Sequence, residues 1–189
     1  NVPEDKFDPY VNGRVFSNCS VRRIILPASL REIGYQMFTG SENIESVSFS
    51  TENPVFDIEG DLIYNRDLKS VVAFVPNQSN EYTIRAGTKT IGKHLFSYDY
   101  FRNKKRKTRI TLPESIEIID HRAFYECNIE AIVLSKNLKI IGEDAFGGTL
   151  IENIRIPETV ESIGAWAFSF CHLLKEIYLP SSLKKLENG

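Results

Sequence analysis

A six-residue phrase, Ile-Gly-x-x-Ala-Phe, recurs along this chain and constrains its fold more than any other feature. The phenylalanines of the last three copies are 22 residues apart, and a worn copy that ends at Phe16 lies 22 residues before Phe38. A period in the low twenties is typical of a solenoid whose units are single short coils. The five copies begin at Ile33, Ile91, Ile119, Ile141 and Ile163, with Met37, Leu95 and Asp120 as departures from the consensus.

A second pattern, a short alternation of apolar and polar residues that often ends in Pro, follows each Phe by about eight to ten residues. Alternation over so few residues predicts a half-buried strand, and Pro ends the strand and turns the chain. Since repeats of one length stack in register, these strands should form one curved parallel sheet. They are expected at 24–26, 47–49, 82–84, 110–112, 132–134, 154–156 and 177–179.

The second place of the phrase holds only Gly, Asn or Asp. These residue types enter the left-handed region most easily, which predicts a positive-φ turn there in every coil. A phosphate-binding loop would need several glycines together before a helix, and this chain has no such cluster. The residues at this place are Asn12, Gly34, Gly92, Asp120, Gly142 and Gly164.

With these motifs in register, the chain resembles the BspA-type leucine-rich repeats from about Val11 to Leu186. The resemblance implies a leucine-rich-repeat solenoid, mostly β with short turns or helical coils. It also implies a surface or secreted protein of host-associated bacteria or of some protist parasites. Proteins of this kind are implicated in adhesion to host matrix or plasma proteins and to other cells.

Repetition makes residues 1–189 one elongated domain, although the length would allow two ordinary ones. The net charge of −2 gives no global basic field, so nucleic acid is an unfavoured partner. No apolar run approaches the roughly 20 residues that span a bilayer, and the chain carries no signal peptide. Because it starts without Met and stops within a unit after Leu183 and Leu186, a piece of a longer repeat protein is expected.

An insertion interrupts the period between Phe38 and Phe96, which are 58 residues apart, 36 more than one unit. The excess lies within about 50–84, where short apolar runs are separated by turn-rich triplets. This pattern predicts a β-hairpin or a three-stranded meander, and similar proteins carry such a hairpin between coils. Two interpretations stay open: the insertion covers a flank of the sheet, or it supplies one wall of a partner site.

A basic loop at 97–109 forms the second interruption and carries six cations in eight residues beside three aromatic residues. Such a run is typical of a solvated loop, and it is also the footprint of a site for a sulfated glycan or another polyanion. The candidate polyanion-binding residues are Arg102, Lys104, Lys105, Arg106, Lys107 and Arg109.

The positions of the cysteine and histidine residues indicate no disulfide, catalytic site or metal site. Cys19, Cys127 and Cys171 each lie three residues after a repeat Phe, so whole coils separate them and a disulfide is not expected. They should be buried, free thiols. His94 and His121 fall in the variable pair of the phrase, which predicts a solvated surface. We therefore expect no enzyme: no catalytic residue, no cofactor and no metal site.

One outward residue lies between the two core residues of each predicted strand, and these residues should form a line about 30 Å long, at ~4.8 Å per coil. A protein partner on this line is the favoured function, with Tyr178 and Arg155 as its strongest contacts. The alternatives are a spacer solenoid without its own ligand, and polyanion binding by the basic loop. The line consists of Ile25, Ser48, Thr83, Thr111, Val133, Arg155 and Tyr178.

Overall fold

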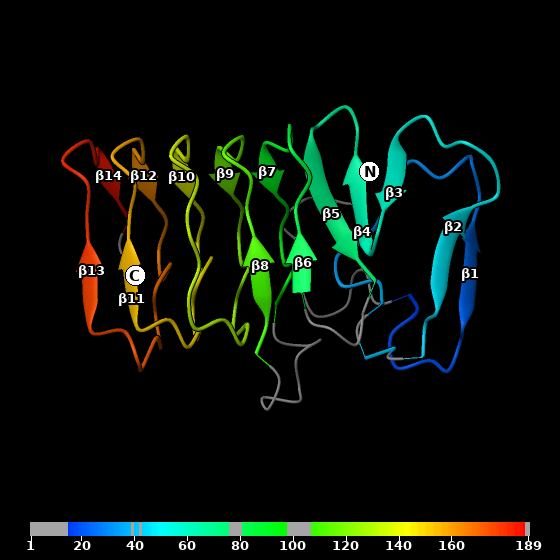
Figure 1. Cartoon of the computed structure of the whole chain (residues 1–189), viewed down its shortest axis with the longest axis horizontal. Helices are drawn as coiled ribbons and strands as arrows, with labels where there is room; N and C mark the ends of the chain where they lie inside the picture. Colours follow the sequence, from blue (N-terminus) through cyan, green and yellow to red (C-terminus); the bar gives the residue numbers. More distant parts are fainter. Residues whose placement is uncertain (1–14, 39, 42, 76–80, 98–106, 188–189) are drawn as a thin grey trace.

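The chain winds into a β-solenoid of stacked coils, seen from the side in Figure 1. The structure is a computed structural model that describes residues 15–38, 40–41, 43–75, 81–97 and 107–187. No helix occurs within these ranges, so the parts of each coil between strands are turns and extended segments rather than helical coils.

One row of strands corresponds to the Pro-terminated alternations. The strands are paired in parallel as expected, but as three separate pairs, β1–β2, β6–β8 and β11–β13, and not as one sheet. The insertion separates β2 from β6, and residues 132–134 lie between β8 and β11 without forming a strand. The row contains β1 (Arg23–Leu26), β2 (Ser46–Phe49), β6 (Glu81–Thr83), β8 (Arg109–Thr111), β11 (Asn153–Arg155) and β13 (Glu176–Tyr178).

A second row forms the continuous sheet of the molecule, eight strands in the order β14-β12-β10-β9-β7-β5-β4-β3. Its five two-residue strands lie at the Ile of the last four phrases and at the equivalent Leu186, where the sequence predicted only a turn, whereas Ile33 of the first phrase forms no strand. The strands are β3 (Phe56–Glu59), β4 (Leu62–Asn65), β5 (Ser70–Phe74), β7 (Thr90–Ile91), β9 (Ile118–Ile119), β10 (Ile140–Ile141), β12 (Ser162–Ile163) and β14 (Lys185–Leu186).

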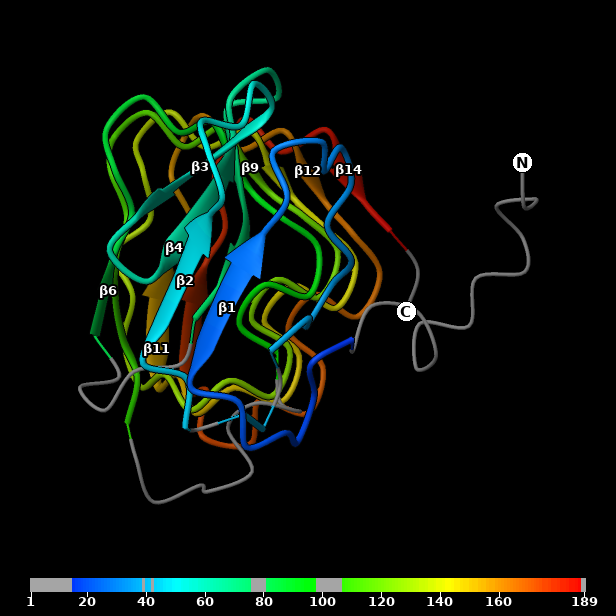
Figure 2. The ribbon, with the colours of Figure 1, turned by 90° about the vertical axis from the view of Figure 1, so that its right-hand side faces the viewer.

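The phenylalanines of successive phrases stack into a column inside the coils. Phe96, Phe124, Phe146 and Phe168 lie with ring centroids 5.1–5.7 Å apart and interplanar angles of 2–16°. Viewed along the axis of the stack, the coils superimpose (Figure 2). Each buried ring removes about 150–250 Å² from water, so the column is a major part of the core.

The insertion is a three-stranded antiparallel meander, β3-β4-β5, as the sequence allowed. Both of its faces are buried: Leu62 and Tyr64 pack into the core of the later coils, and Ile63 packs into the core of the first two. Phe74 of β5 lies 5.2 Å from the ring of Phe96 and so continues the column. The meander therefore does not cover a flank of the sheet, and a contribution to a partner site stays a prediction. It is a partition inside the solenoid, and β5 begins the parallel part of the sheet by pairing with β7.

The glycines of the phrase serve close packing and not a positive-φ turn, which corrects the expectation from the sequence. A Cβ on Gly142 would lie 2.7 Å from the backbone nitrogen of His121, and one on Gly164 would lie 2.5 Å from that of Glu143. The left-handed residue comes two positions later in each coil, with φ of 52–56°. These residues are Gln36, His94, Arg122, Asp144 and Trp166.

Candidate interaction surface

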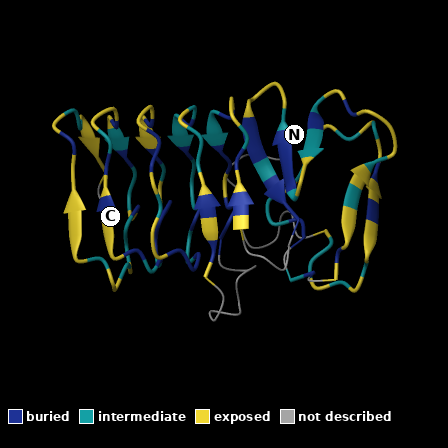
Figure 3. Ribbon diagram, viewed as in Figure 1, coloured by how far each residue is buried: buried dark blue, intermediate teal, exposed yellow. Residues whose placement is uncertain are grey.

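All seven residues of the predicted line are exposed, and in most strands of this row the exposed side chains alternate with buried ones. In β8, for example, Ile110 is buried whereas Arg109 and Thr111 face solvent. Figure 3 shows buried and exposed residues alternating along β6, β8 and β11, whereas β13 is exposed along its whole length. The register places three pairs of the line directly side by side, namely Ile25 with Ser48, Thr83 with Thr111, and Arg155 with Tyr178.

The line is not continuous, which corrects the expectation of one strip. The meander lies between the coils of Ser48 and Thr83, so Ile25 and Ser48 form a separate short row. The remaining residues form what we call the outward row: Thr83, Thr111, Val133, Arg155 and Tyr178.

Arg155 and Tyr178 contact each other on the outward row. The guanidinium of Arg155 lies 5.3 Å from the centre of the Tyr178 ring, within the range of a cation–π interaction. The Tyr178 hydroxyl donates a hydrogen bond of 2.7 Å to Glu176, and this bond raises the pKa of Tyr178. Both side chains are thus held in place by neighbours on the same surface.

Ion pairs between successive coils flank the outward row. Lys107 Nζ lies 2.8 Å from Glu130, Lys175 Nζ lies 2.9 Å from Glu152, and Arg109 pairs with Glu81. Two of the six candidate polyanion-binding cations, Lys107 and Arg109, therefore already face carboxylates of this chain. The other four, Arg102, Lys104, Lys105 and Arg106, lie outside the described residues.

Sequence reasoning missed two anchors of the meander. Asn53 is buried, donates to the carbonyls of Ala28 and Leu30, and accepts from the N–H groups of Val55 and Phe56. An Asn before a Pro in a variable segment gave no signal for this role.

The second anchor is Arg85, which lies in the turn between β6 and β7. Arg85 Nη1 is 2.8 Å from Asp57, and the guanidinium lies 4.0 Å above the Tyr64 ring. Burial, above all, raises the pKa of Tyr64. The pair Arg85–Asp57 joins the meander to the coil that follows it.

The cysteines form the expected rung of thiols and hydroxyls but are less buried than expected. Cys127 is buried, and burial raises the pKa of its thiol beyond the usual range. Cys19 and Cys171, each 3.4 Å from the hydroxyl of a neighbouring coil at Ser41 and Thr149, are half-buried. Within the described part of the chain, each of the two has a stacked coil on one side only, which explains the extra exposure. All three are free thiols.

His94 and His121 are buried or half-buried rather than solvated, which corrects a further expectation. His94 is buried with its ring centroid 5.6 Å from Tyr35 and 5.2 Å from His121. Burial and the neighbouring Arg122 lower the pKa of His121. Arg122 also binds the buried Asp144 through two hydrogen bonds of 2.9 Å, so this side of the coils is a half-buried polar stripe.

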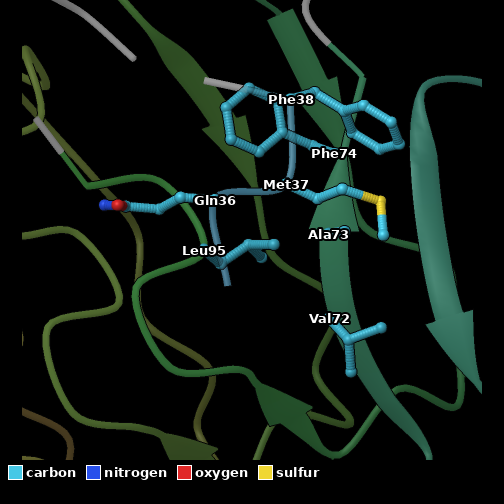
Figure 4. Close-up of a pocket in the computed structure, with 7 residues that line it drawn as sticks. All are labelled: Gln36, Met37, Phe38, Val72, Ala73, Phe74 and Leu95. Atoms are coloured by element: carbon cyan, nitrogen blue, oxygen red, sulfur yellow. The ribbon is translucent and has the colours of Figure 1, made fainter. Parts of the chain in front are cut away.

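A small crevice lies where the coil of Phe38 meets β5 (Figure 4). It has room for about one water molecule, whereas pockets for small ligands measure about 300–1,000 Å³. Across the described ranges, no group of three or more His, Cys, Asp or Glu side chains is placed to hold a metal ion. The crevice is lined by Gln36, Met37, Phe38, Val72, Ala73, Phe74 and Leu95.

Comparison with known proteins identifies the repeat. The family model described as "BspA type Leucine rich repeat region (6 copies)" matches residues 9–80 and 94–189. No curated protein matches the chain. Within the described residues, no helix combines the length and apolar character needed to cross a membrane.

Solved structures share the fold at low sequence identity. A leucine rich cell surface protein from Faecalibacterium prausnitzii A2-165 is 21% identical with a TM-score of 0.71, over 90% of this chain and 45% of that one. A leucine-rich repeat protein from Eubacterium ventriosum ATCC 27560 is 21% identical with a TM-score of 0.60, over 87% and 50%. The pneumococcal vaccine antigen PcpA is 20% identical with a TM-score of 0.54, over 92% and 48%.

This chain thus spans about half the length of each of these three structures. The likeness to them establishes the fold, and the repeat model, which covers most of the sequence, establishes the family. The chain belongs to the BspA-type leucine-rich repeat family.

Proposed function

We propose that this chain is a protein-interaction module that serves adhesion in a cell-surface or secreted protein, and that it is not an enzyme. The observation that carries the proposal is the outward row, an exposed line of side chains on a closely packed, stacked core. Membership in the family and the likeness to a protein described as a leucine rich cell surface protein support the location.

The proposed binding residues are those of the outward row, with Ile25 and Ser48 as a second, shorter contact. Arg and Tyr dominate binding energy when a partner buries them, and both are present in one contact at Arg155 and Tyr178. The partner class that fits an adhesion module is a host matrix or plasma protein.

The test presents the full chain to immobilised fibronectin, laminin and fibrinogen, with heparin as a polyanion. We expect one of the three proteins to bind, and the double variant Arg155→Ala with Tyr178→Ala to weaken that binding at least about tenfold, the loss expected for a binding hot spot. The matched control is Leu68→Ala with Lys93→Ala, two exposed residues away from the outward row.

Each of three other results would favour one of the alternative sites or functions. Unchanged affinity in the double variant would move the site to another face. Binding to heparin alone, lost when Lys104, Lys105, Arg106 and Lys107 are replaced by Ser, would favour polyanion binding by the basic loop. No binding at all would favour a spacer solenoid without its own ligand.

A further inference from the structure

The turn that follows Phe16 carries a sequence motif that the proposed function does not use. Residues 18–20 read Asn-Cys-Ser, which fits the N-x-S/T acceptor sequence for an N-linked glycan. A second match, at 77–79, extends into residues outside the described ranges. So short a motif also arises by chance, and the structure around Asn18 decides whether this copy is accessible.

Cys19 anchors the middle of the motif to the next coil. Its N–H donates to Ser41 Oγ at 3.0 Å, its thiol donates to the carbonyl of Phe16 at 3.1 Å, and its sulfur lies 3.4 Å from Ser41 Oγ. Asn18 and Ser20, on either side of Cys19, are exposed. No hydrogen bond within the described part of the chain occupies the side chain of either residue. The turn thus presents the amide and the hydroxyl of the motif to solvent together.

The backbone at Asn18 belongs to a turn that recurs along the solenoid. The φ of Asn18 is 52°, in the left-handed region that Asn tolerates better than most residue types. In the next coil a Cβ on Gly40 would collide with Asn18 Oδ1, so the Asn18 side chain lies in space that this glycine leaves free. Four other coils have a positive φ of 53–70° at the equivalent place but lack the motif, namely at Gly40, Glu126, Gly148 and Phe170.

We propose that Asn18 is an acceptor for an N-linked glycan, transferred from an oligosaccharide that is carried on a lipid pyrophosphate. The Nδ2 atom of Asn18 forms a bond to the anomeric carbon of the first sugar. The bond between that carbon and the pyrophosphate oxygen breaks, and the lipid pyrophosphate leaves. A base on the transferase takes the amide proton, and nothing is oxidised or reduced. The inference rests on the proposed function for location alone, because acceptor motifs of this kind are used on surface loops of secreted proteins.

The test offers the folded full chain to a purified oligosaccharyltransferase that requires only N-x-S/T, together with a lipid-pyrophosphate-linked oligosaccharide. Every variant carries Asn77→Gln, so that Asn18 is the remaining acceptor motif. We expect the intact mass to rise by a single glycan and peptide mapping to place that glycan on Asn18. Asn18→Gln and Ser20→Ala should each abolish the increase, whereas Ser20→Thr, which keeps the hydroxyl, should preserve it.

The matched control places the same motif on a buried asparagine. Glu130→Thr, combined with Asn18→Gln, creates the motif at Asn128, which is 6% exposed. We expect no transfer to Asn128 in the folded chain, and transfer to it in peptides from a digest of the same variant. Circular dichroism checks that each variant retains the fold.

Three results would overturn the inference: no transfer to the folded chain, transfer that persists in Asn18→Gln, or equal transfer to Asn18 and Asn128 in folded chains. These measurements involve no binding partner, so any of the three leaves the proposed adhesion as it stands. If Asn18 is glycosylated while no matrix or plasma protein binds the chain, the adhesion fails and the acceptor site stands.

Discussion

Single residues hold neighbouring coils together, and Glu117 shows how. Its carboxylate accepts from Lys89 at 2.5 Å and from Lys139 at 2.7 Å, so one side chain joins three successive coils. These two hydrogen bonds lower the pKa of Glu117 to about 2, from an ordinary value of 4.5. The backbone repeats the connection, since the N–H of Glu117 donates to Lys89 and the N–H of Lys139 donates to Glu117.

The depressed pKa of Glu117 predicts a pH dependence of stability. Because its folded-state pKa lies below its unfolded-state value, the stabilisation is complete above about pH 4.5 and is lost as the pH falls toward about 2. Glu117→Gln should therefore flatten the acid limb of a plot of melting temperature against pH. The exposed Glu32→Gln serves as control. An unchanged acid limb in Glu117→Gln would show that the two lysine contacts contribute nothing to folding.

Sequence patterns at residue scale predicted the places that matter but not always their reason. The second position of the phrase was recognised from its Gly, Asn and Asp residues. The reason for glycine at Gly142 and Gly164 is that the backbone of the adjacent coil leaves no room for a Cβ atom. A pattern within one coil does not reveal this contact between coils. The polar stripe of His94 and Arg122 was read as solvated because variety in sequence usually indicates exposure. Packing between coils partly buries it instead.

At the scale of elements, the meander depends on how its entry is fixed. Asn53 makes four hydrogen bonds of 2.8–3.0 Å, two as a donor toward the first coil and two as an acceptor from the chain that enters β3. The buried side-chain amide of Asn53 thus connects the turn at Ala28 and Leu30 to the start of the meander.

Asn53→Asp keeps the size and both acceptor roles but removes the two donated bonds. It should destabilise the protein by about 2–4 kcal/mol, because the carbonyls of Ala28 and Leu30 lose their partner and face a buried carboxylate. The measurement is the free energy of unfolding in urea. Asn137→Asp, an exposed counterpart, should change it little. Equal losses in the two variants would contradict the anchoring role.

The length of a strand decided whether it could be predicted from the sequence. The row that includes β1, β8 and β11 has alternation over three or four residues and a Pro stop, so it was found. The two-residue strands β7, β9, β10, β12 and β14 are too short for any periodicity, so the continuous sheet was missed. The exposure of all seven outward residues was predicted from the alternation in the sequence, although Val133 lies outside any strand and β13 is exposed at every position. The break in their line was not, since it depends on where the meander sits.

At the scale of the whole molecule, the meander divides the hydrophobic interior into two clusters. One includes Leu26, Phe38 and Ile63 and lies with the first two coils. The other extends from Leu62 to Ala167 through the later coils. Stability in a solenoid is roughly a sum over units and their interfaces, so two clusters separated by a partition should open separately.

Matched core substitutions test this division. Leu26→Ala and Leu138→Ala each remove a buried leucine and should each cost about 2–5 kcal/mol. Leu26→Ala should speed amide hydrogen exchange mainly in 15–75, whereas Leu138→Ala should speed it mainly in 81–187. Exchange that rises uniformly along the chain in both variants would show one cooperative unit.

The coils beyond the meander repeat one set of backbone bonds: the N–H of Gly142 donates to Ile119 and that of Gly164 donates to Ile141, both at 2.8 Å. A block of one repeat could be added or removed there with the same backbone hydrogen bonds reproduced, although the side-chain contacts between neighbouring coils would change. The distal surface would then shift by one strand spacing, about 4.8 Å. The length of the solenoid therefore changes in increments of one repeat, and the distance between its two ends can be adjusted while the backbone pattern of each coil stays the same.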